Sequence, residues 1–357
     1  MPKLIKFSAE TERDLLPAWK DYVHTYRKEN FSTNVPVNTK IDLAQKASLI
    51  DKMAGAEIMK FAKVDSSIVA DEQYVSNPNY RWAFFAVVNT LVDAVLPEIV
   101  REDYYKICNV TTIGRGNTAT FDLKSADLFE VSVSGNSRRH VNAQKQFTGT
   151  KTLAPVNHSV TTQVDLYRVM SKEESLAEYA MKVILSIENE IALDIAYAMQ
   201  ESFNTKTTNF KETGFSEDSF QELALRVSTV NRSKCVALGT EIGLAPILPS
   251  DDYLKMGLGE DYVKLGYLPV FKGTPLIALS QSIDYSTADY EFGVSNDYLY
   301  LVSPASQKLV QIVFDDQGLS VPDEIYSNGN LTQNATMHKG WNVAIITNAK
   351  HGVIKLK

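Results

Sequence analysis

The sequence predicts an α+β protein in which helical and β-rich stretches occupy separate blocks, with one β-hairpin too polar to be buried within the chain. Three observations support this prediction. Residues 41–64 place apolar side chains three and four positions apart, which is typical of an amphipathic helix. Residues 104–170 change to β-branched, aromatic and alternating sequence. Residues 171–203 keep one apolar face over an unusually long helical pattern.

The composition is that of a globular, acidic protein. With 357 residues and 44% hydrophobic content, the chain can bury one large core or two ordinary ones. Its 36 Lys and Arg residues against 43 Asp and Glu give a formal net charge of −7. This is the wrong sign for a protein that holds nucleic acid by neutralising phosphates. If the protein meets nucleic acid, we expect it to surround the nucleic acid rather than grip it.

The cysteines and the N-terminal sequence indicate a protein that is made and kept inside a cell. Cys108 and Cys235 are far apart and belong to no CxxC or Cys/His pattern, so we interpret them as two ordinary semi-buried thiols. The first 22 residues contain no apolar run of signal-peptide length. We also find no stretch of about 20 apolar residues that would span a bilayer, and therefore expect no membrane partner.

Residues 1–39 are predicted to form a helix followed by an extended arm that lies across another surface. Leu15, Trp19, Tyr22 and Tyr26 are scattered apolar anchors in this polar stretch. Its end, NFSTNVPVNTK, contains the Pro, Asn and Ser residues that disfavour a continued helix.

Two helices are predicted next. The apolar residues of the first are Leu43, Ala47, Ile50, Ala54, Ile58 and Phe61. In the second, Asn77 can cap the helix, Pro78 takes the first helical position, and the helix runs at least to Leu96. We interpret the aromatic and aliphatic stripe of this second helix as core.

Residues 127–153, DLFEVSVSGNSRRHVNAQKQFTGTKTL, are predicted to form two strands joined by a polar turn at 134–139. Each arm of this ribbon has as many polar as apolar side chains. An isolated two-stranded hairpin is marginally stable in water, because burial on one thin face does not offset the entropy of ordering the chain. We therefore expect the ribbon to pack against another molecule, which makes the protein an oligomer.

Residues 171–203 are predicted to form one helix of about 50 Å, at 1.5 Å per residue. Ser171 and Glu174 have the spacing of a capping box at its start. Its apolar face comprises Leu176, Ala180, Val183, Ile184, Ile187, Ile191, Ile195 and Met199. The adjacent ribbon and the lack of a second helix of this length favour packing along a sheet over a coiled coil. After this helix the pattern is that of a compact mixed α/β region, and WNVAIIT near the end is apolar enough to be an internal strand.

Sequence motifs that would carry chemistry are weak. GRGNT lacks the third glycine of a dinucleotide fingerprint and is interpreted as a tight turn; GLGEDYVKLG lacks the lysine and hydroxyl pair of a P-loop and is interpreted as a loop. The five histidines are scattered, and no HExxH or GxSxG motif occurs. We interpret carboxylate pairs such as Asp315 and Asp316 as solvated turn residues. We assign no catalytic, cofactor-binding or metal-binding residue and expect no enzyme.

The tip of the ribbon is the candidate inter-subunit contact. It contains Asn136 and a small basic patch of Arg138, Arg139 and His140 in an otherwise acidic protein. Arginines in this setting are expected to bind carboxylates of a neighbouring subunit. The acidic partners predicted for them lie on the long helix: Glu173, Glu174 and Glu178.

The order of elements resembles the major capsid proteins of tailed bacteriophages, whose Hong Kong 97-type fold encapsulin nanocompartments share. The resemblance is carried by FDLKSADLFEVSVSGNSRRHVNAQKQF, by TTQVDLYRVM leading into SKEESLAEYAMKVILSIENEIALDIAYAM, and by HKGWNVAIITNAKHGVIKL. It implies an N-terminal arm, an extended β-hairpin called the E-loop, a P domain with a long spine helix, and an A domain. The implied limits are 1–40 for the arm, 41–110 for the N-terminal helices and first P-domain strand, 111–155 for the E-loop, 156–203 for the P-domain strand and spine helix, 204–337 for the A domain and 338–357 for the C-terminal strands.

What the resemblance implies about function is an icosahedral shell of pentamers and hexamers that encloses double-stranded DNA. The location would be the virion capsid, assembled in the host cytoplasm with portal and head-completion proteins. Some relatives carry an N-terminal scaffolding segment, for which there is no room before residue 41, so a separate scaffolding protein or earlier processing is expected. Some relatives also crosslink an E-loop lysine to an asparagine of the adjacent subunit; Lys124, Lys145 and Lys151 are near the ribbon, but we assign this chemistry to none of them.

Two alternatives remain open from the sequence. An encapsulin-type cage would have the same fold but a protein cargo held by a groove on its inner face. A soluble α/β enzyme would need an active site composed of distant residues, and the unburied ribbon argues against it.

Overall fold

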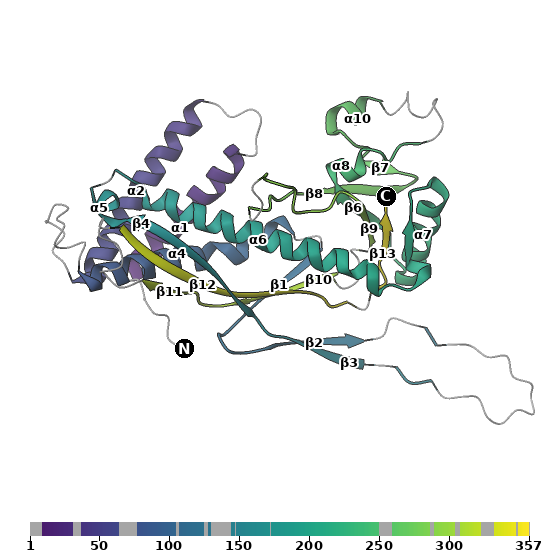
Figure 1. Ribbon diagram of the computed structural model, residues 1–357, viewed down its shortest axis with the longest axis horizontal. Coiled ribbons are helices and arrows are strands. Elements are labelled where there is room, and N and C mark those ends of the chain that lie inside the picture. Colours follow the sequence, from purple (N-terminus) through teal and green to yellow (C-terminus); the bar gives the residue numbers. More distant parts are fainter. Residues whose placement is uncertain are drawn as a thin grey trace, which may run out of the picture.

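The computed structural model describes residues 9–30, 37–63, 77–104, 107–124, 128–129, 144–146, 148–171, 173–249, 259–285, 289–303, 308–322, 332–347 and 349–356. Figure 1 shows two lobes joined by one long helix, with a two-stranded ribbon that leaves the body and points past the second lobe. The described elements begin with helices and end with strands, with helices and strands mixed between them, so the predicted combination of helices and sheets in an α+β protein is confirmed.

Three N-terminal helices pack together at one end of the molecule: α1 (Ala9–Asn30), α2 (Val37–Ala62) and α4 (Pro78–Asp103). The anchors Leu15 and Trp19 of α1 are fully buried, and Trp19 Nε1 donates a hydrogen bond to the Leu91 carbonyl of α4 at 3.0 Å. This part of the predicted arm is therefore a core helix. Residues 31–36, where an extended segment was expected, lie outside the described residues.

Helix α4 begins as predicted, with the Asn77 side chain accepting a hydrogen bond from Asn79 N and with Pro78 in the first turn. It continues past Pro97 to Asp103. Contrary to the sequence expectation, residues 78–102 are long and apolar enough to cross a membrane by length and composition. Because 67% of the apolar window is buried inside the molecule, α4 is a core helix here.

The first sheet runs along the length of the first lobe. It contains the strands β1 (Cys108–Ile113), β4 (Val156–Asp165), β10 (Val310–Asp315), β11 (Leu319–Pro322) and β12 (Thr332–Ile345). The long strand β12 pairs antiparallel with β4 along one edge and with β10 and β11 along the other, and β1 adds in parallel beside β10. Helices α4 and α6 contact this sheet. The tail segment WNVAIIT belongs mostly to β12, so its prediction as a strand is confirmed, but only Trp341 lies between two strands, because residues 342–345 pair with β10 alone among the described strands.

Helix α6 (Leu176–Thr205) is the predicted long helix, about 45 Å long at 1.5 Å per residue. All eight residues of its predicted apolar face are buried. The predicted capping box is wrong: Ser175 is the N-cap and accepts from Glu178 N, whereas Ser171 ends the short helix α5 (Leu166–Met170). Because the short helix α5 ends at Ser171, the long helix begins after the next serine, Ser175.

The second lobe has a sheet of its own. Its strands, in spatial order, are β5 (Lys211–Thr213), β13 (Gly352–Lys355), β9 (Tyr298–Val302), β6 (Val236–Thr240), β8 (Thr274–Leu279) and β7 (Val270–Phe271). The described residues of this lobe form the helices η1 (Thr208–Phe210), α7 (Glu217–Asn231), α8 (Glu241–Leu244) and α10 (Gly259–Leu265). One apolar cluster of this lobe includes Phe220, Phe271 and Leu299, whereas Leu238, Tyr300 and Val353 of the same sheet belong to the large cluster that continues into the first lobe.

Three local predictions can be compared with these elements. The strands β10 and β11 belong to the first sheet and β13 to the second, so the implied domain limit at 337 does not coincide with the division between sheets. GLGEDYVKLG is not only a loop, because it contains α10. GRGNT is the predicted tight turn, with Gly116 at φ +83° between β1 and β2 (Ala119–Lys124).

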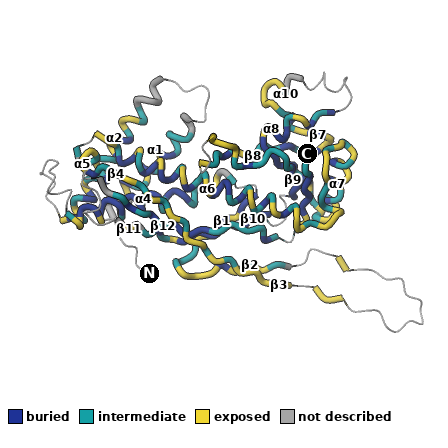
Figure 2. Tube along the Cα trace, viewed as in Figure 1, coloured by how far each residue is buried: buried dark blue, intermediate teal, exposed yellow. Residues whose placement is uncertain are grey.

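The ribbon consists of β2 and β3 (Thr148–Leu153), which pair antiparallel from Ala119 with Leu153 to Lys124 with Thr148. Pairing thus starts earlier in the chain than the predicted arms. The described residues form no third strand on either edge of this ribbon. Figure 2 shows that the ribbon is largely exposed, in contrast to the buried strands of the two lobes. The predicted turn at 134–139 lies outside the described residues.

Candidate assembly surface

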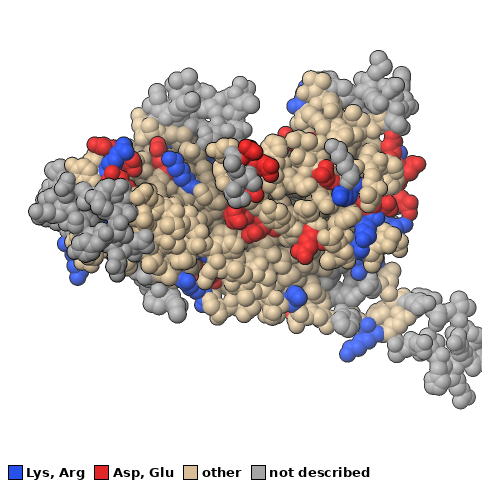
Figure 3. Space-filling model, in the orientation of Figure 1, with Lys and Arg blue, Asp and Glu red and all other residues tan. Residues whose placement is uncertain are grey.

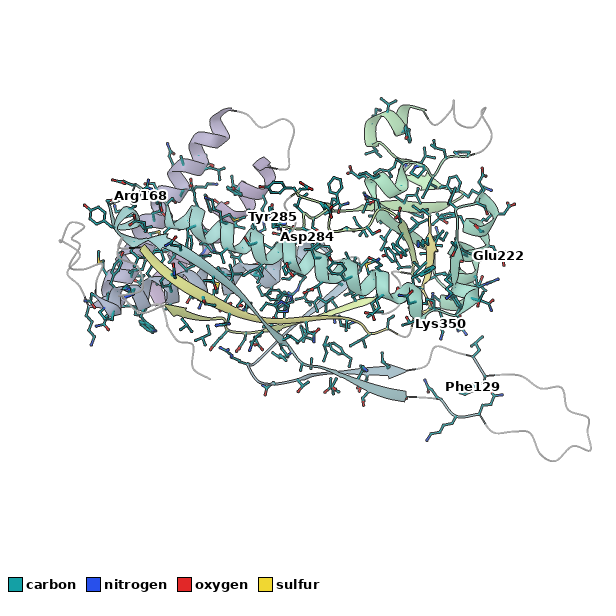
Figure 4. The ribbon with its side chains drawn as sticks, in the orientation of Figure 1. Phe129, Arg168, Glu222, Asp284, Tyr285 and Lys350 are labelled. Carbon is teal, nitrogen blue, oxygen red and sulfur yellow. The ribbon has the colours of Figure 1, made fainter. Side chains whose placement is uncertain are left out.

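The ribbon is the candidate functional site because it exposes side chains that the chain itself does not cover. Leu128 and Phe129, just beyond β2, are 75% and 59% exposed. Burying a large apolar side chain from water contributes roughly 1.5–3 kcal/mol. Two such residues side by side on a projecting ribbon therefore favour contact with another molecule. Figure 4 shows Phe129 on the ribbon, away from both lobes.

The root of the ribbon is fixed to the first sheet at both strands. On the β2 side, Arg115 N donates to Asp316 Oδ1 at 3.2 Å, and Asp316 N donates to the Ile113 carbonyl at 2.8 Å. On the β3 side, Asn342 Nδ2 of β12 donates to the Ala154 carbonyl at 2.7 Å. These bonds set the direction in which the ribbon leaves the body, so it acts as a stiff projection at its base.

Strand β4, which follows the ribbon, is connected to α6 through a stacked pair of aromatic side chains. His158 of β4 stacks on Trp341 of β12, with ring centroids 3.7 Å apart and planes 11° from parallel. Trp341 is buried, and its Nε1 donates to Asp194 Oδ2 of α6 at 2.8 Å. These two contacts connect β4, the strand that follows the ribbon, to the first sheet and to α6.

A buried charged pair joins α4 to the same sheet. Asp93 of α4 accepts hydrogen bonds from Lys339 Nζ of β12 and, at 2.8 Å, from Gly318 N. Burial raises the pKa of Asp93, while the Lys339 charge opposes that rise. Nearby Asp315, predicted to be a solvated turn residue, is instead 4% exposed at the end of β10, and burial raises its pKa. That prediction was wrong because β10 is an internal strand, which its local sequence does not reveal.

The predicted contact residues have different outcomes. Asn136, Arg138, Arg139 and His140 lie outside the described residues, so their role as the ribbon tip contact stays a prediction. The sequence did not single out Leu128 and Phe129, although an apolar pair inside the polar stretch ADLFE was the available signal.

The predicted acidic partners sit at the far end of the first lobe. Glu173 and Glu174 lie in the turn before α6 rather than on it, and only Glu178 is in its first turn. Arg168 forms ion pairs with Glu173 and Glu174: its Nε lies 3.3 Å from the Glu173 carboxylate and its Nη1 lies 2.9 Å from the Glu174 carboxylate. Figure 4 places Arg168 at the end of the molecule away from the second lobe. Two of the three carboxylates thus already have a cation within the chain.

The two cysteines are separate buried thiols. Cys108 and Cys235 are unpaired and buried, and burial raises the pKa of both thiols, that of Cys235 to about 12. Among the described residues no group of three or more His, Cys, Asp or Glu could hold a metal ion.

No protein-family model matches the sequence, and no curated protein matches it either. Several solved structures are similar to the chain at low identity. The capsid of a native GTA particle has 9% identity and a TM-score of 0.49, covering 71% of this chain and 89% of that one. The capsid of Helicobacter pylori bacteriophage KHP30 has 12% identity and a TM-score of 0.46, covering 70% and 88%. The holo-SrpI encapsulin of Synechococcus elongatus PCC 7942 has 10% identity and a TM-score of 0.42, covering 70% and 84%.

The described elements follow the order that the resemblance to Hong Kong 97-type proteins implies. A projecting ribbon precedes a sheet strand and the long helix α6, a second lobe follows, and the long strand β12 returns to the first sheet.

Proposed function

We propose that the protein is the major capsid protein of a tailed double-stranded DNA bacteriophage, and that it self-assembles into the icosahedral head shell. The observation that supports this most is the ribbon: two paired strands with a fixed root, an exposed Leu128 and Phe129, and no third strand among the described residues. Such a ribbon is marginally stable by itself and gains stability from packing on another molecule, which in this proposal is another copy of the chain.

The shape of the molecule suits a shell subunit. The projecting ribbon contacts a different surface on the next copy, and such head-to-tail contacts generate closed rings when the rotation between copies closes. Rings of five and six copies would form the shell. Many weak contacts per copy then add up to a stable particle, because each contact formed raises the effective concentration for the next.

The acidic character of the chain supports a role as a container for DNA. A net charge of −7 disfavours tight binding of packaged DNA to the inner wall. Under this proposal the protein is located in the virion and assembles in the host cytoplasm. Its partners are a scaffolding protein, a portal protein and head-completion proteins.

Negative-stain electron microscopy of the purified chain after size-exclusion chromatography tests the proposal, with nuclease-treated and untreated samples compared. We expect closed particles, tubes or rings of five or six copies. Nuclease-protected DNA inside particles from infected cells would support the capsid over an encapsulin-type cage, whereas a protein cargo without DNA would support the cage. A monomer or dimer that never assembles, even with a co-expressed scaffolding protein, would contradict both.

A further inference from the structure

The loop between β8 and β9 presents three exposed aromatic side chains on the flank of α6 opposite to the ribbon. Tyr285, Tyr290 and Phe292 are 69%, 68% and 56% exposed, and the two tyrosine rings meet edge to face with centroids 6.1 Å apart. Figure 4 places Tyr285 on one side of α6 and Phe129 on the other, and Figure 1 shows the loop running from the second lobe over the long helix. We call Tyr285, Tyr290 and Phe292 the aromatic surface.

The backbone beneath the aromatic surface is held in place by α6. Asn189 of α6 donates its Nδ2 to the Ile283 carbonyl at 2.7 Å and accepts from Ile283 N at 3.2 Å. Ile283 in turn forms a β-bridge with Phe292, and Asp284 N donates to the Glu291 carbonyl at 2.9 Å. The aromatic side chains are therefore displayed by a fixed support rather than by a loose loop.

The next residues toward β9 strengthen this support. Gln281 donates its Nε2 to the Val294 carbonyl and accepts from Val294 N, both at 3.0 Å. Gly293 lies so close to α6 that a Cβ added there would collide with the Leu193 side chain. Gly293 and the amide side chains of Asn189 and Gln281 thus fix the loop that carries the exposed rings. Aromatic groups that are ordered before binding are typical anchors of protein interfaces.

The chemistry around the aromatic surface matches the ribbon. Asp284, Asp289 and Glu291 adjoin the rings, and Figure 3 shows acidic side chains gathered over the middle of the molecule between the lobes. The ribbon offers the complement: apolar Leu128 and Phe129, both exposed, and arginines further out in its sequence. Apolar and aromatic side chains pack on aromatic rings, and arginine binds both carboxylates and ring faces.

The positions of the two surfaces fit a ring of copies. In a head-to-tail ring, the ribbon on one flank of a copy meets the opposite flank of its neighbour. The aromatic surface lies on that opposite flank. We propose that the aromatic surface is the docking site for the ribbon of an adjacent copy, with that copy's Leu128 and Phe129 as the apolar anchors. This inference rests on the proposed shell function and replaces Glu173 and Glu174 as the main receiving surface.

Crosslinking between copies tests this contact. One population carries Phe129→Cys and a second carries Tyr290→Cys; the two are mixed before assembly, treated with a short bismaleimide and separated on a denaturing gel. The native Cys108 and Cys235 are 1% and 6% exposed, which keeps the background low. We expect crosslinked dimers from the mixture, and none from either variant alone. A chain carrying both substitutions should give a ladder that ends at five or six copies.

A matched control replaces Tyr290→Cys by Leu225→Cys, an equally exposed position on α7 (65% exposed) that lies outside the aromatic surface. Assembled particles in which the Phe129→Cys and Tyr290→Cys copies do not crosslink, or crosslink no better than this control, would overturn the docking site while leaving the shell function intact. If the unsubstituted chain never assembles, the shell function fails and the docking site fails with it.

Discussion

His351 is a buried ionisable residue where the end of α6 meets the C-terminal strand. Its Nδ1 lies 3.0 Å from Lys206 Nζ. Burial, reinforced by the Lys206 charge, lowers the pKa of His351 to about 3. Burial, reinforced by the Lys350 charge, lowers the pKa of Lys206 to about 8. Both shifts favour the uncharged form, so this contact is a structural junction between α6 and β13 that acid should weaken.

The pH dependence follows from the direction of the His351 shift. Between pH 6.5 and about pH 3 the unfolded chain binds a proton at His351 that the folded chain does not. The free energy of unfolding therefore falls as the pH falls through this window, by at most about 1.4 kcal/mol per pH unit from this one group. We expect His351→Gln to show a shallower loss between pH 6 and pH 4, measured by urea unfolding at each pH.

The control for this prediction is His24→Gln, which removes a histidine whose side chain is 43% exposed. Its slope between pH 6 and pH 4 measures the effect of removing an exposed histidine. Equal slopes for His351→Gln and the unsubstituted chain would show that His351 does not titrate as its burial implies.

At the scale of single elements, the start of α6 lies at Ser175 in the structure and at Ser171 in the sequence prediction. Ser175 accepts from Glu178 N at 3.3 Å, whereas the Ser171 hydroxyl donates to the Arg168 carbonyl at 3.1 Å in an exposed turn. We expect Ser175→Ala to lower the free energy of unfolding by about 1 kcal/mol, the usual cost of a lost N-cap. Ser171→Ala should cost less than about 0.5 kcal/mol, as most exposed substitutions do. Denaturant unfolding of the two variants measures the difference, and the reverse order would favour the start predicted from sequence.

The elements differ in how far local sequence predicts them. Helical spacing identified α2, α4 and the apolar face of α6, because burial on one helix face leaves a periodic pattern. The sheet partners of β10, β11 and β13 could not be predicted from local sequence. Strand β10, for example, pairs with β1 about 200 residues earlier in the chain and with β12 about 30 residues later. The burial of Asp315 was missed for the same reason. The ribbon was predictable from composition, because its polar arms cannot form a core.

At the scale of the whole molecule, the basic residues predicted at the ribbon tip should affect assembly and not folding. Replacing Arg138 and Arg139 by Glu places acidic groups where the neighbouring surface is itself acidic. We expect the variant to unfold at the same temperature as the unsubstituted chain and to form no shells, as seen by calorimetry and electron microscopy. Replacement of both by Lys keeps the charge and serves as the control. Intact shells from the Glu variant would refute a role for these arginines.

The most direct test of ribbon-driven assembly is sedimentation velocity of the unsubstituted chain beside a chain whose residues 125–147 are replaced by a two-residue Asn-Gly turn. This turn closes a two-residue hairpin between Lys124 and Thr148, the last paired residues of β2 and β3. We predict that the shortened chain sediments as a folded monomer under conditions in which the full chain forms rings or shells. Shells of normal size from the shortened chain would contradict the account.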